Sequence, residues 1–144
     1  MKRRERTRVL VEGDPEIARR IASEVEQATN VDVIDAPREE LVMVKVRESA
    51  RRSQFYVGEA LMTTCRVKVC GTQGFGMLLG SSRDAAYALA VADAAFECGG
   101  DSFDIAGWDA LLCAEACRLD AEAAAARRAV EATKVDFSTM EVEL

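Results

Sequence analysis

The stretch "QFYVGEALMTTCRVKVCGTQGFGMLLGSS", residues 54–82, predicts two antiparallel strands that lead into a helix. From residue 63 to 69 the side chains of one face are small or apolar, and two on the other face are basic, a pattern typical of a half-buried strand. Gly58 marks a bulge or crossing point in this long strand. Gly71 and Gly74 are spaced for a hairpin turn, and Gly80 predicts a break before the helix.

The flanking segments supply the remaining elements. On the C-terminal side, residues 81–100 predict a helix with a weak capping box from Ser81 to Asp84, and a long helix follows from about 104 to 133. On the N-terminal side, "VDVID" (31–35) and "LVMVKVRES" (41–49) read as two strands, preceded by helices at 3–12 and 15–28. Asp14 is the expected N-cap of the second helix, with Pro15 at its first position. The sequence therefore predicts a single α+β domain over residues 1–144, with two N-terminal helices, an antiparallel sheet of about four strands, and two C-terminal helices packed on that sheet.

Composition and charge exclude several classes of protein. With 49% hydrophobic and 31% charged residues, the 144-residue chain has the composition of one globular core. Its net charge of -6 argues against a nucleic-acid partner, and we interpret the basic cluster "MKRRERTR" (1–8) as a solvated first turn or frayed terminus rather than a groove-binding arm. No apolar run approaches the roughly 18 residues of a membrane span, and no secretory signal is evident, so we expect a cytoplasmic protein without a membrane partner.

Few residues offer catalytic or metal chemistry. The chain has no histidine, and its five cysteines lack the spacing of zinc sites, so we predict neither a catalytic set nor a metal. Asp93 lies within a nearly all-alanine helical face. It is either a functional carboxylate or, as we favour, a buried one paired with backbone or with an arginine of a neighbouring element.

The glycines at 71–80 raise the possibility of a phosphate loop. Their spacing fits neither a Walker loop nor a dinucleotide fingerprint. The start of the following helix, Ser81, Ser82 and Arg83, remains a possible anion site, with Ser81 or Ser82 as its cap. This leaves an alternative function open, that of a small autonomous nucleotide- or phosphate-binding protein.

One family combines these features. The run "FYVGEALMTTCRVKVCGTQGFGMLLGSSRDAAYALAVADAA" (55–95) and the later "KVDFSTM" (134–140) resemble the G subunit of the bacterial carbon-phosphorus lyase core complex, over about residues 31–140. The residues that carry the resemblance are Gly58, Glu59, Ala60, Thr63, Val67, Gly71, Gly74, Gly80, Asp93, Ala94, Val135, Asp136, Phe137, Thr139 and Met140.

The resemblance implies a role in phosphonate catabolism. In that family the G subunit assembles with the H, I and J subunits, and the complex transfers the ribose triphosphate moiety of ATP to methylphosphonate and releases adenine. The resemblance assigns the nucleosidase step to the I subunit and the later bond cleavage to the iron-sulfur J subunit. It thus implies a non-catalytic scaffold without a cofactor of its own, within a complex for which ATP is a substrate.

The C-terminal tail is a candidate partner-binding segment. Val135, Phe137 and Met140 are apolar and follow the last helix, with too little chain remaining to build another element. The tail can equally fold back on its own core. Phe137 is the expected anchor, since buried aromatic residues often dominate interfaces.

Overall fold

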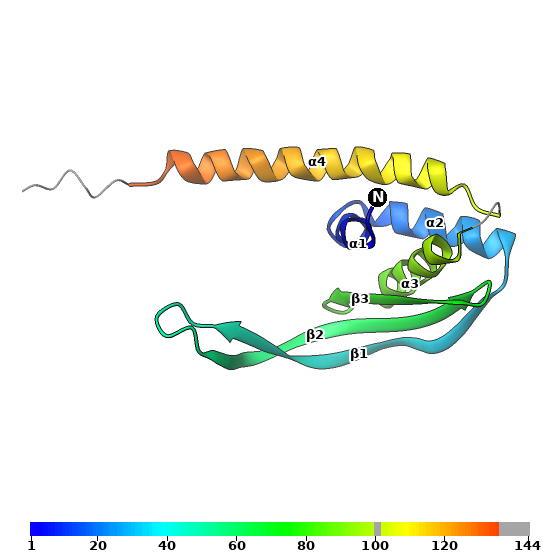
Figure 1. The fold of residues 1–144 in the computed structure, drawn as a ribbon, viewed down its shortest axis with the longest axis horizontal. Helices are drawn as coiled ribbons and strands as arrows, with labels where there is room; N and C mark the ends of the chain where they lie inside the picture. The colour runs from blue at the N-terminus through cyan, green and yellow to red at the C-terminus, as the bar shows by residue number, and fades with distance from the viewer. Residues whose placement is uncertain (100–101, 136–144) are drawn as a thin grey trace, which may run out of the picture.

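The computed structural model describes residues 1–99 and 102–135, which form a layered α+β fold (Figure 1). The elements follow in the order α1 Arg3–Glu12, α2 Pro15–Ala28, β1 Val31–Arg47, β2 Gln54–Val69, β3 Thr72–Leu79, α3 Arg83–Cys98 and α4 Ile105–Ala132. Helix α3 lies on one face of the sheet, α1 and α2 pack on α3, and α4 packs on α1 and α2. The predicted fold class is confirmed. Among the helices of these ranges, none is long and apolar enough to cross a membrane.

The sheet has three antiparallel strands in the order β1-β2-β3, so the prediction of about four was one too many. The two strands expected at 31–35 and 41–49 are one strand, because the chain remains extended through Pro37. Within the described sheet β1 pairs only with β2, so an edge position tolerates the missing N–H of proline. Register shifts between residues 33 and 38 absorb the irregularity.

Three of the glycines discussed above, Gly58, Gly71 and Gly80, have backbone conformations that favour glycine. Cys70 and Gly71 form the two-residue turn between β2 and β3, with φ of 48° and 85°, which is the combination of a type I′ hairpin. Gly80 has φ of 89° and ends β3 before α3. Gly58 lies at a register shift in the pairing of β1 with β2, the place where a bulge was predicted.

Gly74 is not a turn residue, contrary to the prediction. It lies within β3 and, with Gly76, forms a seam on which α3 rests. A Cβ on Gly74 would be 2.1 Å from the carbonyl oxygen of Ala90, and one on Gly76 would be 1.9 Å from that of Ala86. These glycines therefore let the helix backbone approach the strand backbone directly.

The core lies between α3 and the sheet and continues into α2 and the start of α4. Its fully buried side chains include valines of β2, alanines along α3 and the largest apolar residues of the helices; these are Val67, Val69, Ala86, Ala90, Ala94, Ile21, Val25 and Leu112. Trp108 closes one end, with its ring edge-on to Phe96 at 5.5 Å and stacked on Phe103 at 5.8 Å. The helices and the sheet thus share one interior, in which α3 is buried on most of its surface.

The N-terminal basic segment is helical from Arg3 and mostly exposed, but one of its cations is buried. Arg6 in α1 is only 7% exposed; its guanidinium lies 4.3 Å from the centre of the Phe96 ring and donates a 3.0 Å hydrogen bond to Glu97. Its charge is therefore satisfied by an aromatic face and a carboxylate of α3. The segment is thus mostly solvated, as predicted, but the burial of Arg6 was not predicted, because neither of its contacts is local in the chain.

Helix α4 packs on α1 and α2. The sequence prediction had placed it on the sheet and was wrong on this point. Only its first half is buried, through residues that include Trp108 and Leu112. Glu115 joins this half to the α1–α2 corner: its carboxylate accepts hydrogen bonds from the backbone N–H of Asp14 at 2.8 Å and from Arg118 at 2.6 and 2.9 Å. The second half, from residue 121, projects beyond the core (Figure 1).

Candidate functional site

The start of α3 brings the predicted anion-binding residues together but also supplies a carboxylate to them. Ser82 occupies the N-cap position without a side-chain capping bond, so the predicted capping box does not form. Ser81 Oγ instead donates to Glu39 at 2.8 Å, and Arg83 Nε lies 3.5 Å from the same carboxylate. The backbone N–H of Ser82 donates to Thr63 Oγ1 at 3.1 Å. An external anion would therefore have to displace the chain's own Glu39.

A pocket of about 400 Å³ lies beside this helix start, between α2 and α3. Arg19 and Arg83 line it together with Glu26, Asp84 and Tyr87. The two cations and two carboxylates balance in charge, so the pocket does not select an anion by its net charge.

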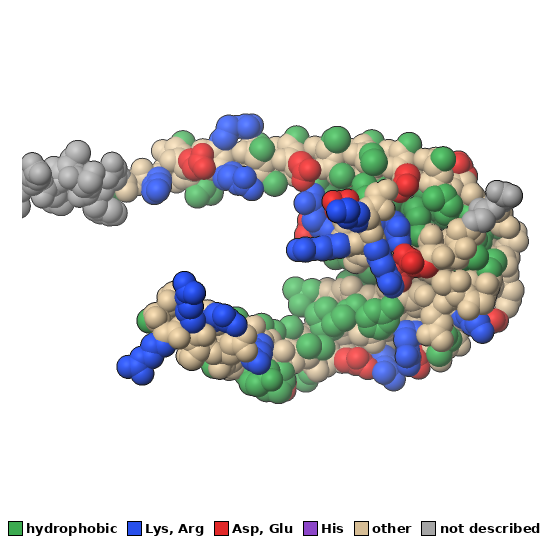
Figure 2. Space-filling view, in the orientation of Figure 1, with side chains coloured by type: hydrophobic (Ala, Val, Ile, Leu, Met, Phe, Trp, Pro, Cys, Tyr) green, Lys and Arg blue, Asp and Glu red, His purple; other side chains and the backbone are tan. Residues whose placement is uncertain are grey.

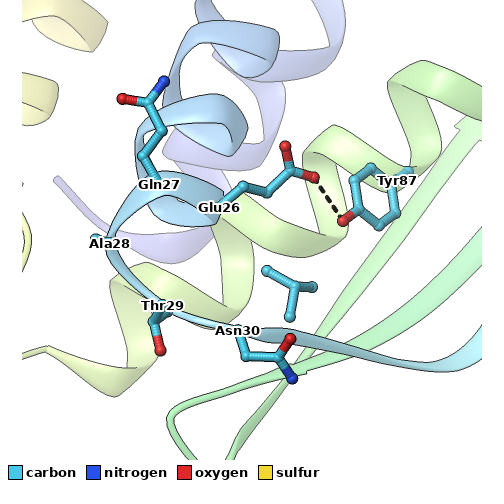
Figure 3. A pocket seen from close by; sticks show the side chains of 7 residues that line it. Glu26, Gln27, Ala28, Thr29, Asn30 and Tyr87 are labelled. Carbon is cyan, nitrogen blue, oxygen red and sulfur yellow. Dashed lines mark hydrogen bonds between the residues drawn. The ribbon is translucent and has the colours of Figure 1, made fainter.

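A second pocket, of about 490 Å³, shares Glu26 and Tyr87 and continues to the α2–β1 connection (Figure 3). The two side chains point toward each other, and Tyr87 Oη donates a 2.7 Å hydrogen bond to Glu26. Burial, followed by this carboxylate, raises the pKa of Tyr87 to about 12. The phenol is therefore protonated at neutral pH and is suited to orienting Glu26 rather than to proton abstraction.

Asp93 has the paired arrangement that we favoured from the sequence. It is 5% exposed, accepts two hydrogen bonds from Arg3 at 2.6 and 2.9 Å, and accepts a third from the backbone N–H of Phe75 at 3.1 Å. These contacts join α1, β3 and α3. With its oxygens engaged in this way, Asp93 acts in the structure as a link between elements.

The cysteines do not gather into a metal site. No group of three or more potential ligands occurs in the part of the chain that the structure describes. Cys65 is buried, and burial raises the pKa of its thiol. Burial, followed by the neighbouring thiol of Cys70, raises the pKa of Cys98, and the Sγ of Cys70 itself donates to Thr29 Oγ1 at 3.8 Å.

The predicted partner-binding tail is only partly described. Val135 is 65% exposed. Phe137 and Met140 lie outside the described residues.

The sequence interpretation missed a more extensive surface, which we call the arm: residues 41–61, comprising the end of β1, the connecting turn and the start of β2. Pairing of β2 with β3 begins at Met62, so the arm is a two-stranded ribbon that extends past the third strand (Figure 1). Apolar side chains on it are widely exposed, namely Leu41 65%, Val57 61%, Tyr56 58%, Met43 57%, Phe55 46%, Leu61 41% and Val42 38%. The sequence signal that could have revealed it is the length of the extended run Gln54–Val69, which is twice that of the following strand Thr72–Leu79.

Comparison with known proteins gives two matches. A family model described as phosphonate metabolism protein PhnG matches residues 1–142. The alpha-D-ribose 1-methylphosphonate 5-triphosphate synthase subunit PhnG of Rhizobium meliloti (strain 1021) is 32% identical over 117 residues, which cover 81% of this chain and 73% of that protein. The family match includes all seven elements of the fold, the arm among them.

Proposed function

Because the chain belongs to the PhnG family of phosphonate metabolism proteins, we propose that it is a subunit of an alpha-D-ribose 1-methylphosphonate 5-triphosphate synthase. Its partners are the H, I and J subunits of the carbon-phosphorus lyase core complex. The assembly transfers the ribose triphosphate moiety of ATP to methylphosphonate and releases adenine. The observation that carries this proposal is the family match over residues 1–142.

Within that complex the chain acts as a scaffold rather than a catalyst. Two features support this role. The side chains of the described residues that could act in catalysis are already hydrogen-bonded to one another, as Asp93 is to Arg3 and Tyr87 is to Glu26. The apolar arm, in contrast, is widely exposed and suits contact with another protein.

Reconstitution tests the scaffold role. Formation of alpha-D-ribose 1-methylphosphonate 5-triphosphate from ATP and methylphosphonate is measured, first for the purified chain alone and then for the H, I and J subunits with and without it. We expect no turnover by the chain alone, and turnover by the other three that depends on adding it. Turnover by the partner-free chain would contradict the scaffold proposal.

The alternative of an autonomous nucleotide-binding protein has a separate test. We expect calorimetric titration of the isolated chain with ATP to show no micromolar binding, because Glu39 already faces Ser81 and Arg83. Micromolar binding that is lost in Arg83→Ala would favour the alternative.

The tail contributes to the same assembly, with Phe137 as its anchor. Phe137→Ala is expected to reduce co-purification with the other subunits and to leave the thermal unfolding of the isolated chain unchanged. An unchanged yield of complex, together with a less stable isolated chain, would assign Phe137 to the protein's own core.

A further inference from the structure

The arm exposes apolar side chains on both of its faces. Cross-strand partners share a face, so Leu41 and Leu61 lie on the side that also carries Met43. Val42 and Phe55 lie on the opposite side. The apolar residues form two surfaces, and within the described chain neither is covered by another element.

The long edges of the arm are also free within the described residues. Strand β1 pairs only with β2, and β3 reaches no further along β2 than Met62, apart from a hydrogen bond from the N–H of Gly80 to the carbonyl of Leu61 at 2.8 Å. An isolated two-stranded ribbon is at best marginally stable in water, and free edges with apolar faces invite association.

The tip of the arm is basic, and its turn is held by hydrogen bonds to one acidic side chain. Between residues 45 and 52 the chain carries four basic side chains against one acidic one, Glu48, although its overall net charge is -6. The carboxylate of Glu48 accepts hydrogen bonds from the backbone N–H groups of Ala50 and Arg51, at 3.0 and 2.5 Å, and these bonds lower its pKa. The acidic side chain is thus used to build the turn. The cations, Lys45, Arg47, Arg51 and Arg52, make no ion pair with any described residue.

We propose that the arm docks into another subunit of the synthase, on a surface that is apolar along the ribbon and acidic around its basic tip. The inference rests on the proposed function and specifies which part of the chain carries the assembly. Figure 2 shows the arm and the far half of α4 extending in the same direction from the body of the protein, with a hollow between them and with Lys and Arg gathered at the end of the arm. A partner can therefore reach the inner face of the ribbon as well as its tip.

Charge distinguishes this occupant from a second copy of the chain. A tip-to-tip contact between two copies would bring two basic tips together, and like charges facing each other in an interface oppose association. An acidic partner surface gains from the same charges. The widely exposed apolar faces disfavour nucleic acid, whose backbone offers charge but no apolar surface.

Co-expression with the H, I and J subunits tests the proposal. The tagged chain is purified as the wild type and as three arm variants. Two carry a single substitution on the ribbon, Leu41→Glu or Met43→Glu, and the third combines Arg47→Glu with Arg51→Glu at the tip. Val33→Glu is the matched control, because Val33 lies in the same strand outside the arm and is 51% exposed. We expect at least tenfold lower recovery of partners with each arm variant and unchanged recovery with the control. Thermal unfolding of each isolated variant should match the wild type, because the arm packs on no described helix.

The outcomes separate the two levels of inference. If the wild-type chain recovers no partner, the proposed function fails. If the arm variants recover partners as well as the wild type does, the function stands and the docking role of the arm is wrong.

Two further results would assign the arm to another occupant. If light scattering finds a dimer of the isolated chain that Leu41→Glu dissociates, the occupant is a second copy. If removal of residues 136–144 speeds hydrogen exchange in the arm, the occupant is the chain's own tail. Slowed exchange in residues 54–60 on assembly of the complex would instead support the proposal.

Discussion

Replacing Gly74 by alanine should separate α3 from the sheet. The new Cβ would lie 2.1 Å from the carbonyl oxygen of Ala90 and 2.4 Å from the amide nitrogen of Ala94, and both are backbone atoms that no rotamer change can move aside. Ordinary contact begins near 3.4 Å, so the helix must move by about 1.3 Å. A gap of even 0.5–1 Å forfeits roughly a quarter to a half of each dispersion contact across it.

The size of the effect follows from this displacement. Overpacking a core typically costs about 1–3 kcal/mol, and a clash with two backbone atoms of α3 places Gly74→Ala at the upper end, about 3 kcal/mol. For a chain of this length that loss corresponds to a fall in Tm of roughly 10 °C. Gly76→Ala should cost a similar amount, since its Cβ would be 1.9 Å from the carbonyl oxygen of Ala86. The double variant should cost less than the sum, because one movement of the helix relieves both clashes.

Urea unfolding followed by circular dichroism measures these differences. Gly71→Ala is the control: it has φ of 85° but no atom within 4 Å of the added Cβ, so it should lose only the backbone term of about 1–2 kcal/mol. If Gly74→Ala unfolds within about 0.5 kcal/mol of the wild type, or if its double variant with Gly76→Ala is fully additive, the seam does not set the distance between α3 and the sheet.

Two other predictions concern Glu115 and the neighbouring thiols of Cys70 and Cys98. Arg118 and the backbone N–H of Asp14 hold the pKa of Glu115 near 2, below its ordinary 4.5. Its stabilising contribution is therefore complete above the unfolded-state pKa and is lost as the pH falls from about 4.5 through 2. In urea unfolding, Glu115→Gln should be less stable than the wild type at pH 7, with a difference that shrinks at pH 3; an equal difference at both pH values would refute this. Oxidation by diamide should form a disulfide between Cys70 and Cys98 within one chain, which lowers the mass of the chain by two hydrogens and blocks alkylation of both thiols. The control variant Cys98→Ser should show neither change. Full alkylation of the oxidised wild type would show that the two thiols are not neighbours.

The elements that sequence predicted well are those whose signals are local. Helix α2 has the bounds that Asp14 and Pro15 indicated, because an N-cap and a first-turn proline act within a few residues. The sequence did not predict that β1 continues through Pro37. A strand tolerates proline at the edge of a sheet, and which strand lies at the edge depends on the whole sheet. Arg3 and Asp93 are 90 residues apart in the chain. The sequence therefore predicted only that a buried Asp93 would pair with backbone or with an arginine, and it did not identify the arginine.

The candidate sites show the same division. Ser81 and Arg83 lie together because they are close in the chain, but Glu39, which contacts both, comes from β1. The arm was hidden because alternating apolar residues predict a strand without indicating whether a neighbouring element covers it. Exposure is a property of the assembled sheet, in which β3 is half as long as its neighbours.

The glycine seam beneath α3 also has an entropic consequence. Alanine and glycine have no rotamers to lose, so the close contact of Gly74 and Gly76 with Ala86, Ala90 and Ala94 forms without the ordering cost of long side chains. A core of leucine or methionine can accommodate a substitution by exchanging rotamers, but this seam has none to exchange. Its evolution should therefore proceed by keeping small residues on both sides, while the apolar residues elsewhere in the core vary more freely.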